Sequence, residues 1–144
     1  MKAMPLFKWT KAQAVFVTEI DAQHRNLYLL ANELNQAIVG GAETSRTMEL
    51  LRALIAAADE HFSYEESLMR ATHYSAKDWH KQQHDTVRKR IAQFVPRIES
   101  GEGEAAILLL EFLSGWLHDH TGLTDRMLGA HLRNFDRLTA RLAS

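Results

Sequence analysis

Apolar residues recur at alternating intervals of three and four positions along four long segments of the chain. Because an α-helix turns once in about 3.6 residues, this spacing places the apolar side chains on one face of each helix. The segments cover about residues 18–38, 44–70, 76–98 and 104–128. Pro96 lies late in the third segment and should kink or end that helix. Amphipathic helices with short connections pack side by side in alternating direction. We therefore predict an all-α fold, an antiparallel up-down-up-down four-helix bundle.

The two ends of the chain lack this long-range pattern. Residues 1–17 are irregular and predict an N-terminal arm, in which three aromatic residues could fold back as a cover: Phe7, Trp9 and Phe16. After Gly129 a shorter apolar stripe predicts a short C-terminal helix over about residues 129–142. With 144 residues the chain has the size of one domain. We expect the arm, the bundle (about residues 18–128) and the C-terminal helix to form a single domain, 1–144.

Composition narrows the chemistry that such a bundle could carry. The chain has no cysteine, which excludes disulfides, thiolate catalysis and cysteine-bound zinc or iron–sulfur sites. Its formal net charge of -1 gives no reason to expect nucleic acid or an anionic membrane as a partner. No stretch approaches the roughly 18 apolar residues that a membrane span requires, and the start does not resemble a signal peptide. We therefore expect a cytoplasmic protein with no membrane span.

Five of the eight histidines occupy positions on the apolar stripes. They are His24, His61, His80, His84 and His120. A single imidazole on an apolar face is usually a hydrogen-bonded core residue, and burying each of the five unpaired would cost about 1–3 kcal/mol. One shared metal site would give all of them a partner, because neutral imidazole is a common metal ligand. Their positions along the helices also place them near one end of the bundle. A metal-free helical bundle is the alternative.

Carboxylates accompany these histidines at helical spacing. Glu65 follows His61 by four residues, one turn along nearly the same face, so the pair can reach one metal centre. His84 follows His80 at the same interval and offers two nitrogens in the same way. Each of these two helices is therefore expected to contribute a pair of ligands.

Asp125 is the weakest ligand candidate on geometry alone. It follows His120 by five residues, which is about 140° round an ideal helix, so only a distorted turn near Gly122 would bring it inward. Five imidazoles and two carboxylates exceed the ligands of one zinc ion and suit two six-coordinate metals that share the carboxylates. Imidazole with carboxylate favours iron, with manganese and zinc as alternatives.

Four motifs, in this order, resemble those of the hemerythrin family and specifically of its bacterial branch. They are Ile20-Asp21-x-Gln23-His24-x-x-Leu27, His61-Phe62-x-x-Glu65-Glu66, His80-Lys81-x-x-His84 and Trp116-Leu117-x-x-His120-x-x-x-x-Asp125. The resemblance covers about residues 7–128. Each motif alone is weak, but the four together, with no ligand missing and at separations that suit a bundle, are highly specific.

The resemblance implies two iron ions and a role for each candidate ligand. Three histidines would hold an iron that is coordinatively filled: His80, His84 and His120. Two histidines would hold the other iron, which is five-coordinate and keeps an open position: His24 and His61. Two carboxylates would bridge the irons, beside an oxo or hydroxo group: Glu65 and Asp125.

The function that the resemblance implies is reversible binding of molecular oxygen, held as hydroperoxide on the five-coordinate iron. Carboxylate-rich di-iron enzymes typically use four carboxylates and two histidines, and this chain inverts that ratio. We therefore expect an oxygen carrier, store or supplier rather than an enzyme, with at most a weak peroxidase side activity. The alternatives are a di-iron oxidase or peroxidase, or a sensor of oxygen or nitric oxide that acts through a partner. Bundles of this length are often monomeric, and we expect a monomer.

Four further residues are predicted to line the oxygen pocket: Leu27, Trp116, Leu117 and Thr121. Leu27 and Leu117 resemble family positions that cover the open site, and Trp116 could pack against the ligands. Plain core filling is an equal alternative for these three. Thr121 stands where the family usually has isoleucine. Its hydroxyl either bonds to its own backbone or makes the pocket wetter, which would speed loss of the oxygen adduct to the ferric state.

Overall fold

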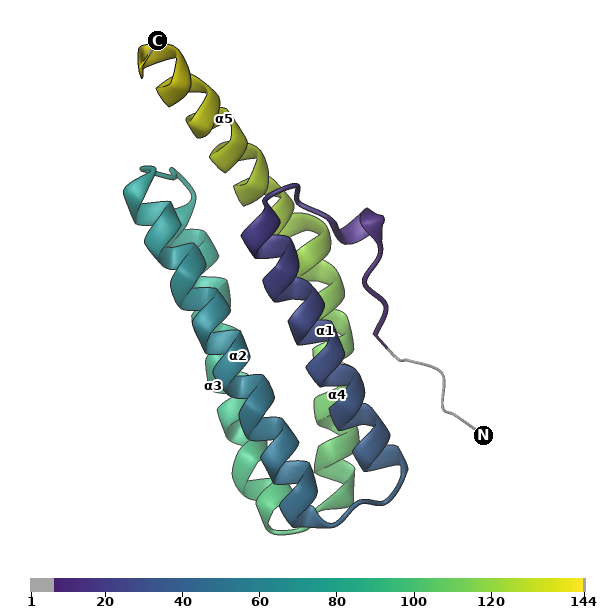
Figure 1. Cartoon of the computed structure of the whole chain (residues 1–144). Helices are drawn as coiled ribbons and strands as arrows, with labels where there is room; N and C mark the ends of the chain where they lie inside the picture. The colour runs from purple at the N-terminus through teal and green to yellow at the C-terminus, as the bar shows by residue number, and fades with distance from the viewer. Residues whose placement is uncertain (1–6, 144) are drawn as a thin grey trace.

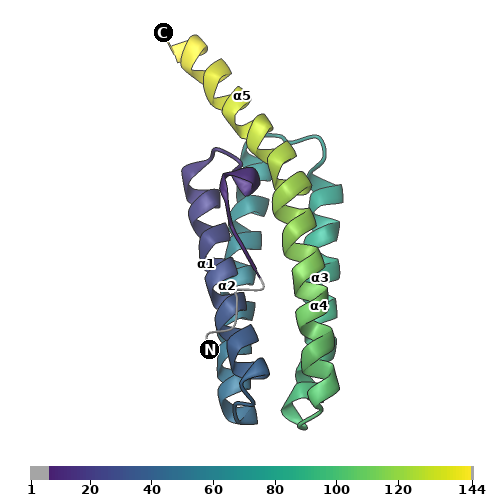
Figure 2. The same cartoon turned by 90° about the vertical axis from the view of Figure 1, so that its right-hand side faces the viewer.

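The computed structural model describes residues 7–143, which form a bundle of four antiparallel helices with one helix projecting from it (Figures 1 and 2). The elements of the arm and bundle are η1 (Lys11–Gln13), α1 (Thr18–Val39), α2 (Thr44–Ala71), α3 (Lys77–Glu99) and α4 (Gly103–Asp119). Helices α1 and α3 each pack against both α2 and α4, so the four enclose one interior. The predicted all-α up-down-up-down bundle is confirmed, and the described residues contain no β-strand. No helix among them is long and apolar enough to cross a membrane.

Glycines allow the chain to reverse between helices. Gly41 follows α1 with a φ of +71°, and Gly101 follows α3 with a φ of +90°. Both values lie in the left-handed region, which glycine adopts without the steric cost of a Cβ. Pro96 does not end α3, which continues to Glu99. The proline lies in the last turn, where its missing N–H removes only one backbone hydrogen bond.

The fourth bundle helix continues past the predicted boundary at Gly129. It passes into a π-helical turn, η2 (His120–Thr124), and then into α5 (Asp125–Ala143) without interruption. Gly129 allows close packing rather than a turn, because a Cβ there would lie 2.7 Å from the carbonyl oxygen of Val15. The predicted C-terminal helix is therefore the outer part of a longer helix that projects beyond the bundle (Figure 1).

Two apolar clusters fill the interior. The long cluster occupies most of the bundle and includes Leu34, Leu51, Phe62, Leu109 and Leu117, each at most 1 % exposed. The end cluster lies where α5 begins and consists of Val15, Ile20, Met69, Tyr74, Leu128 and Leu132. In sequence, the buried histidines and carboxylates described below lie between residues of these two clusters, except that Phe62 of the long cluster follows His61. Apolar side chains therefore enclose the polar level from both directions.

The N-terminal arm runs back along the bundle (Figure 2). Phe7 is buried, and its backbone N–H and carbonyl both form hydrogen bonds with the side chain of Asn32 on α1. Two of the three aromatic residues predicted as a cover pack against the long cluster. Phe16 was expected to join them and does not, since it is 69 % exposed, and Val15 is the buried residue of the end cluster instead. Residues 1–6 of the predicted arm lie outside the described residues.

Candidate metal centre

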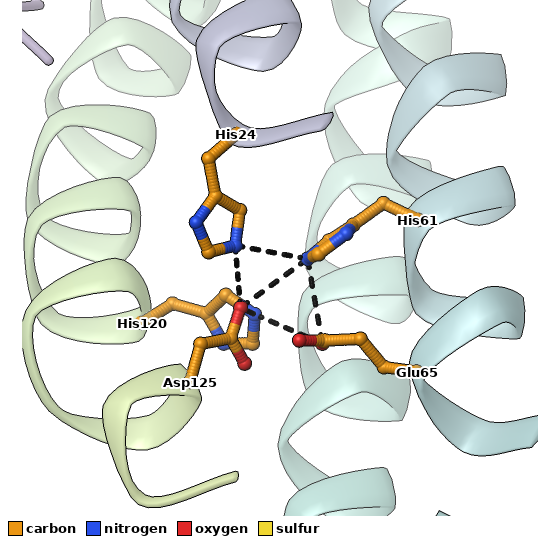
Figure 3. A group of neighbouring side chains, drawn as sticks. All are labelled: His24, His61, Glu65, His120 and Asp125. Atoms are coloured by element: carbon orange, nitrogen blue, oxygen red, sulfur yellow. Dashed lines mark hydrogen bonds and ion pairs between the residues drawn. The ribbon is translucent and has the colours of Figure 1, made fainter. Parts of the chain in front are cut away.

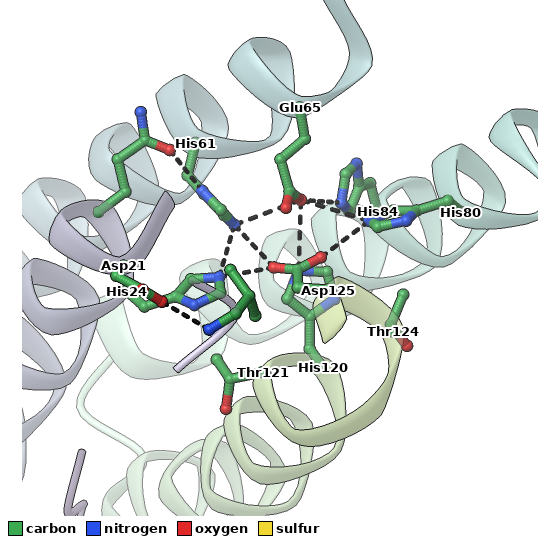
Figure 4. A network of polar contacts seen from close by, with 12 residues as sticks. Asp21, His24, His61, Glu65, His80, His84, His120, Thr121, Thr124 and Asp125 are labelled. Atoms are coloured by element: carbon green, nitrogen blue, oxygen red, sulfur yellow. Dashed lines mark hydrogen bonds and ion pairs between the residues drawn. The ribbon is translucent and has the colours of Figure 1, made fainter. Parts of the chain in front are cut away.

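All seven predicted metal ligands meet at one level of the bundle (Figures 3 and 4). They form two overlapping groups, in each of which the ligand atoms lie within 4.8 Å of one another. The first group contains His24, His61, Glu65, His120 and Asp125, and the second contains Glu65, His80, His84, His120 and Asp125. Every member is buried, with at most 2 % exposed. Both carboxylates and one imidazole are common to the two groups.

Helical spacing explains how α2 and α3 each contribute a pair of these side chains. On α2, His61 and Glu65 are one turn apart, and His61 Nε2 lies 3.3 Å from Glu65 Oε1. On α3, His80 and His84 are also one turn apart, and their ring centroids lie 4.6 Å from each other. Because α2 and α3 are antiparallel neighbours, the late residues of α2 lie beside the early residues of α3.

The π-helical turn η2 brings Asp125 into the site. The backbone N–H of Asp125 donates to the carbonyl of His120, five residues earlier, whereas an α-helix would pair residues four apart. This bond stacks the two residues on the same side of the helix, and both side chains point into the cluster (Figure 3). The sequence required a distorted turn near Gly122, and the structure has one, around that residue.

Two close contacts between imidazoles and Asp125 are not hydrogen bonds. His120 Nε2 lies 2.9 Å from Asp125 Oδ2, and His80 Nε2 lies 3.0 Å from Asp125 Oδ1, but neither contact has hydrogen-bond geometry. His24 Nε2 and His61 Nε2 lie 3.2 Å apart, so that two imidazole nitrogens face each other. Nitrogen and oxygen atoms of these side chains therefore converge on one shared space, as ligands around a cation do.

Unpaired buried atoms test whether a metal ion fits this space. Among the described residues, the buried side-chain atoms without a hydrogen-bond partner include Glu65 Oε2, Asp125 Oδ1 and His120 Nε2. Each unpaired group costs about 1–3 kcal/mol, so three of them at one place call for a further partner. Imidazole nitrogens and carboxylate oxygens are ligands of iron, manganese and zinc. The residues present therefore fit bound metal ions.

Opposite charges compensate one another in the cluster. Burial opposes a charge on His120, but Asp125 and Glu65 outweigh it and raise the pKa of His120 to about 10. The same carboxylates raise the pKa of His80 to about 9, again against the effect of burial. Burial also opposes ionisation of Asp125 and Glu65, yet the nearby imidazoles hold the pKa of both carboxyls below the usual range. A cation that binds here must therefore displace protons from two imidazoles.

Two polar side chains bind the outer nitrogens of the cluster. Gln23 Oε1 lies 2.6 Å from His61 Nδ1, and Glu66 Oε2 lies 2.8 Å from His84 Nδ1. In both pairs the ring N–H donates, because an amide or carboxylate oxygen accepts. Glu66 had no predicted role. The sequence did show that Glu66 directly follows the candidate ligand Glu65. The next residue of a helix is turned by about 100°, so Glu66 lies beside the face that carries the ligands, on the side where α3 packs.

Three of the four residues predicted to line an oxygen pocket pack around the cluster. Leu27 and Leu117 are each 1 % exposed and belong to the long cluster. Trp116 is partly buried, and its ring centroid lies 5.5 Å from that of His120. This packing agrees equally with core filling and with a pocket wall, so the pocket stays a prediction for these residues.

The hydroxyl of Thr121 is occupied by partners outside the cluster. It donates to the carbonyl of Leu117 at 2.6 Å, and the hydroxyl of Tyr28 lies 2.9 Å from it. Figure 4 shows the Thr121 hydroxyl pointing away from the histidines. Of the two orientations considered from the sequence, the structure has the one in which threonine bonds to its own backbone.

Fold and cluster together define a class, the helical-bundle domains with an interior site suited to cations. The family model "Hemerythrin HHE cation binding domain" matches residues 15–132 of the chain. The chain therefore belongs to the hemerythrin family. Members of this family are oxygen-binding proteins with non-haem iron rather than enzymes, and the cluster has the residue types that could bind such a metal.

Bacterial relatives and solved structures agree with this assignment. A bacteriohemerythrin of Stenotrophomonas maltophilia is 29% identical over 138 residues, which cover 93% of this chain and 89% of that protein. One from Pseudomonas aeruginosa is 31% identical over 101 residues, covering 70% of this chain and 65% of the relative. The crystal structure of a wild-type hemerythrin has a TM-score of 0.79 at 27% identity, covering 88% of this chain and 98% of that one. The chain is thus similar to hemerythrins of the bacterial type.

Proposed function

We propose that this chain binds molecular oxygen reversibly at a centre of two iron ions, as a carrier, store or supplier. The observation that carries the proposal is the convergence of five buried imidazoles and two buried carboxylates, some of whose atoms have no hydrogen-bond partner. Iron held there would supply the redox change on which reversible oxygen binding depends. The cytoplasmic location and the monomeric state expected from the sequence stay predictions.

The two groups of ligand atoms support two metal positions. Glu65 and Asp125 belong to both groups, as residues that bridge two ions would. We assign one position to His24 and His61, and the other to His80, His84 and His120. Because His120 belongs to both groups, its assignment depends on the family resemblance rather than on distance.

The ligand set favours binding of oxygen over its use as an oxidant. Only two of the seven ligands are carboxylates, and neutral imidazoles donate less charge to highly oxidised iron. We propose Leu27 and Leu117 as walls of the oxygen pocket, where their burial would exclude water. The Thr121 hydroxyl bonds to the backbone and to Tyr28, so it adds no free polar group to that pocket. An oxidase, a peroxidase and a sensor that acts through a partner rank below oxygen binding.

Metal content combined with a visible spectrum tests the proposal. The protein is loaded with iron, reduced without oxygen and then exposed to air. Two irons per chain, with a charge-transfer band that appears in air and disappears under vacuum, are the expected result. A band that decays irreversibly would replace reversible binding with an oxidase or peroxidase. Absence of bound iron would overturn the di-iron site itself.

A further inference from the structure

The two proposed metal positions differ in what binds the far side of their histidines. Of the five imidazoles in the cluster, three have a buried Nδ1 with no hydrogen-bond partner: His24, His80 and His120. The other two donate outward, His61 to the amide of Gln23 and His84 to the carboxylate of Glu66. One partner is neutral and the other is charged, and each serves a different group of ligands.

Glu66 is held as a fixed carboxylate. Glu66 is 8 % exposed, and Arg88 Nη1 lies 3.0 Å from Glu66 Oε2, the oxygen that also accepts from His84. Arg88 is itself held by Asp59 and Asp85, at 3.0 Å and 2.9 Å. The carboxylate therefore has little freedom to leave the imidazole.

Packing fixes the His84 ring from a second direction. The ring stacks on Phe62 with centroids 4.2 Å apart and planes 17° from parallel. The Arg88 guanidinium lies over the same Phe62 ring, 5.1 Å from its centroid. The orientation of this ligand is thus set by a hydrogen bond and by a stacked ring together.

Gln23 gives His61 a weaker partner. Its side chain is only partly buried, and its Nε2 lies 3.5 Å from Glu19 Oε1, at the limit of a hydrogen bond. An amide oxygen carries no net charge, so it draws the Nδ1 proton of His61 less than a carboxylate would. Outer partners of this kind orient a ligating histidine and raise its basicity, and a carboxylate does so more strongly.

We propose that Glu66 and Gln23 are positioning residues that make the two metal positions unequal in how tightly they hold iron. The position beside His84 retains its ion, and the position beside His61 releases its ion first. This inference rests on the proposed function, because it requires two metal ions. The two positions already differ in affinity for iron, because one has three imidazole ligands and the other has two. The contribution of Glu66 and Gln23 is therefore isolated by replacing the carboxylate with an amide at one position and the amide with a carboxylate at the other.

The experiment follows iron release from the loaded protein to a ferrous chelator under reducing, oxygen-free conditions. The wild-type chain should release iron in a fast and a slow phase of equal size. Removing the charged partner with Glu66→Gln should speed the slow phase by about tenfold and leave the fast phase unchanged. Supplying a charged partner with Gln23→Glu should slow the fast phase by about tenfold and leave the slow phase unchanged.

Two control variants make the same chemical changes away from the cluster. Glu60→Gln removes an exposed negative charge from α2, and Gln36→Glu adds one at an exposed position of α1. Both should release iron as the wild type does. Thermal unfolding of each iron-free variant identifies any general loss of structure, which would speed both phases together.

The outcomes separate this inference from the function on which it rests. If the wild-type chain holds two irons but each exchange alters both phases equally, or neither phase, the inequality does not come from Glu66 and Gln23. If the exchanges act on the opposite phases, the assignment of the positions is wrong. If the wild-type chain never holds two irons, the proposed di-iron function fails, and the inference fails with it.

Discussion

The two ends of the bundle are built from the same helices but are stabilised in different ways. At the end away from α5 the interior is apolar, with Leu34, Leu51 and Leu109 fully buried. Burying each such side chain contributes about 1.5–3 kcal/mol to folding. Toward the other end, at the level between the long cluster and the end cluster, seven ionisable side chains are buried side by side, and each loses hydration that only a partner can offset. The apolar end is stabilised by side chains that need no polar partner, whereas the site needs opposite charges, or cations that could bind there, to offset the lost hydration.

This contrast predicts that stability and metal binding respond separately to mutation. A substitution at the apolar end should change the free energy of unfolding and leave the metal content alone. A substitution at the site end should change the metal content and leave the bundle folded. Four experiments test how far this separation holds.

Loss of iron from Glu65→Ala is the largest expected effect. Both proposed positions share this carboxylate, so iron per chain should fall from two to fewer than one. Far-ultraviolet circular dichroism should still report a helical protein, because the long cluster is intact. Glu60→Ala, an exposed change on the same helix, should keep both irons. Retention of two irons by Glu65→Ala would exclude Glu65 as a ligand.

Leu109→Ala should have the largest effect on stability. Leu109 is fully buried in the long cluster, and truncating such a leucine costs about 2–5 kcal/mol through lost burial and a residual cavity. Denaturant unfolding measures the cost, and iron analysis of the folded variant should still give two ions per chain. Iron loss from a folded Leu109→Ala protein would show that the two ends are coupled.

Alkaline pH should destabilise the iron-free protein. The pKa values of His80 and His120 are raised from 6.5 to about 9 and about 10 in the folded state. A raised pKa contributes stability that is fully present below the unfolded value and is lost as the pH rises through the folded value. Between those limits we expect the melting temperature to fall by roughly 5–10 °C.

The iron-loaded protein provides the comparison for that pH series. Its ligating imidazoles have already lost their protons to the metal, so its melting temperature should change less over the same interval. Melting curves that fall in parallel for the two forms would mean that these two imidazoles do not cause the pH dependence.

Thr121→Val should have the smallest effect. The variant removes a hydroxyl that bonds to Leu117 and Tyr28, which should cost about 1 kcal/mol of stability. Because that hydroxyl points away from the histidines, the rate of autoxidation should equal that of the wild type. A slower rate in Thr121→Val would show that the hydroxyl does reach the oxygen pocket.

The sequence was sufficient to predict the four-helix bundle and to predict that its seven candidate ligands lie close together. A three-and-four spacing fixes which face of a helix is buried, and histidines on that face must lie in the interior. Their use as ligands depends on the family resemblance and on the unpaired atoms of the cluster. Antiparallel packing with short connections then places these histidines at the same level along the bundle axis. For example, His61 near the end of α2 and His80 near the start of α3 are joined through one short loop.

The remaining features depend on contacts between segments far apart in the chain. Gly129 reads as a helix boundary in the sequence, but it accommodates Val15 of the arm, which no local pattern indicates. Phe16 was one of three aromatic residues expected to form a cover, yet its backbone has a φ of 60° and its ring is exposed. The contact between Glu66 and His84 could likewise not be predicted without knowing how α2 and α3 are aligned along the bundle axis.

The π-helical turn has a consequence for the phase of everything that follows it. One extra residue would advance an α-helix by about 100°, and the wider π turn accommodates that residue, so α5 points in a different direction from the one that a regular helix of the same length would give it. This difference in direction sets Asp125 toward the histidines and also sets Leu128 and Leu132 toward the end cluster. A regular α-helical turn of the same length over His120–Thr124 would therefore misdirect a candidate ligand and an apolar face at once.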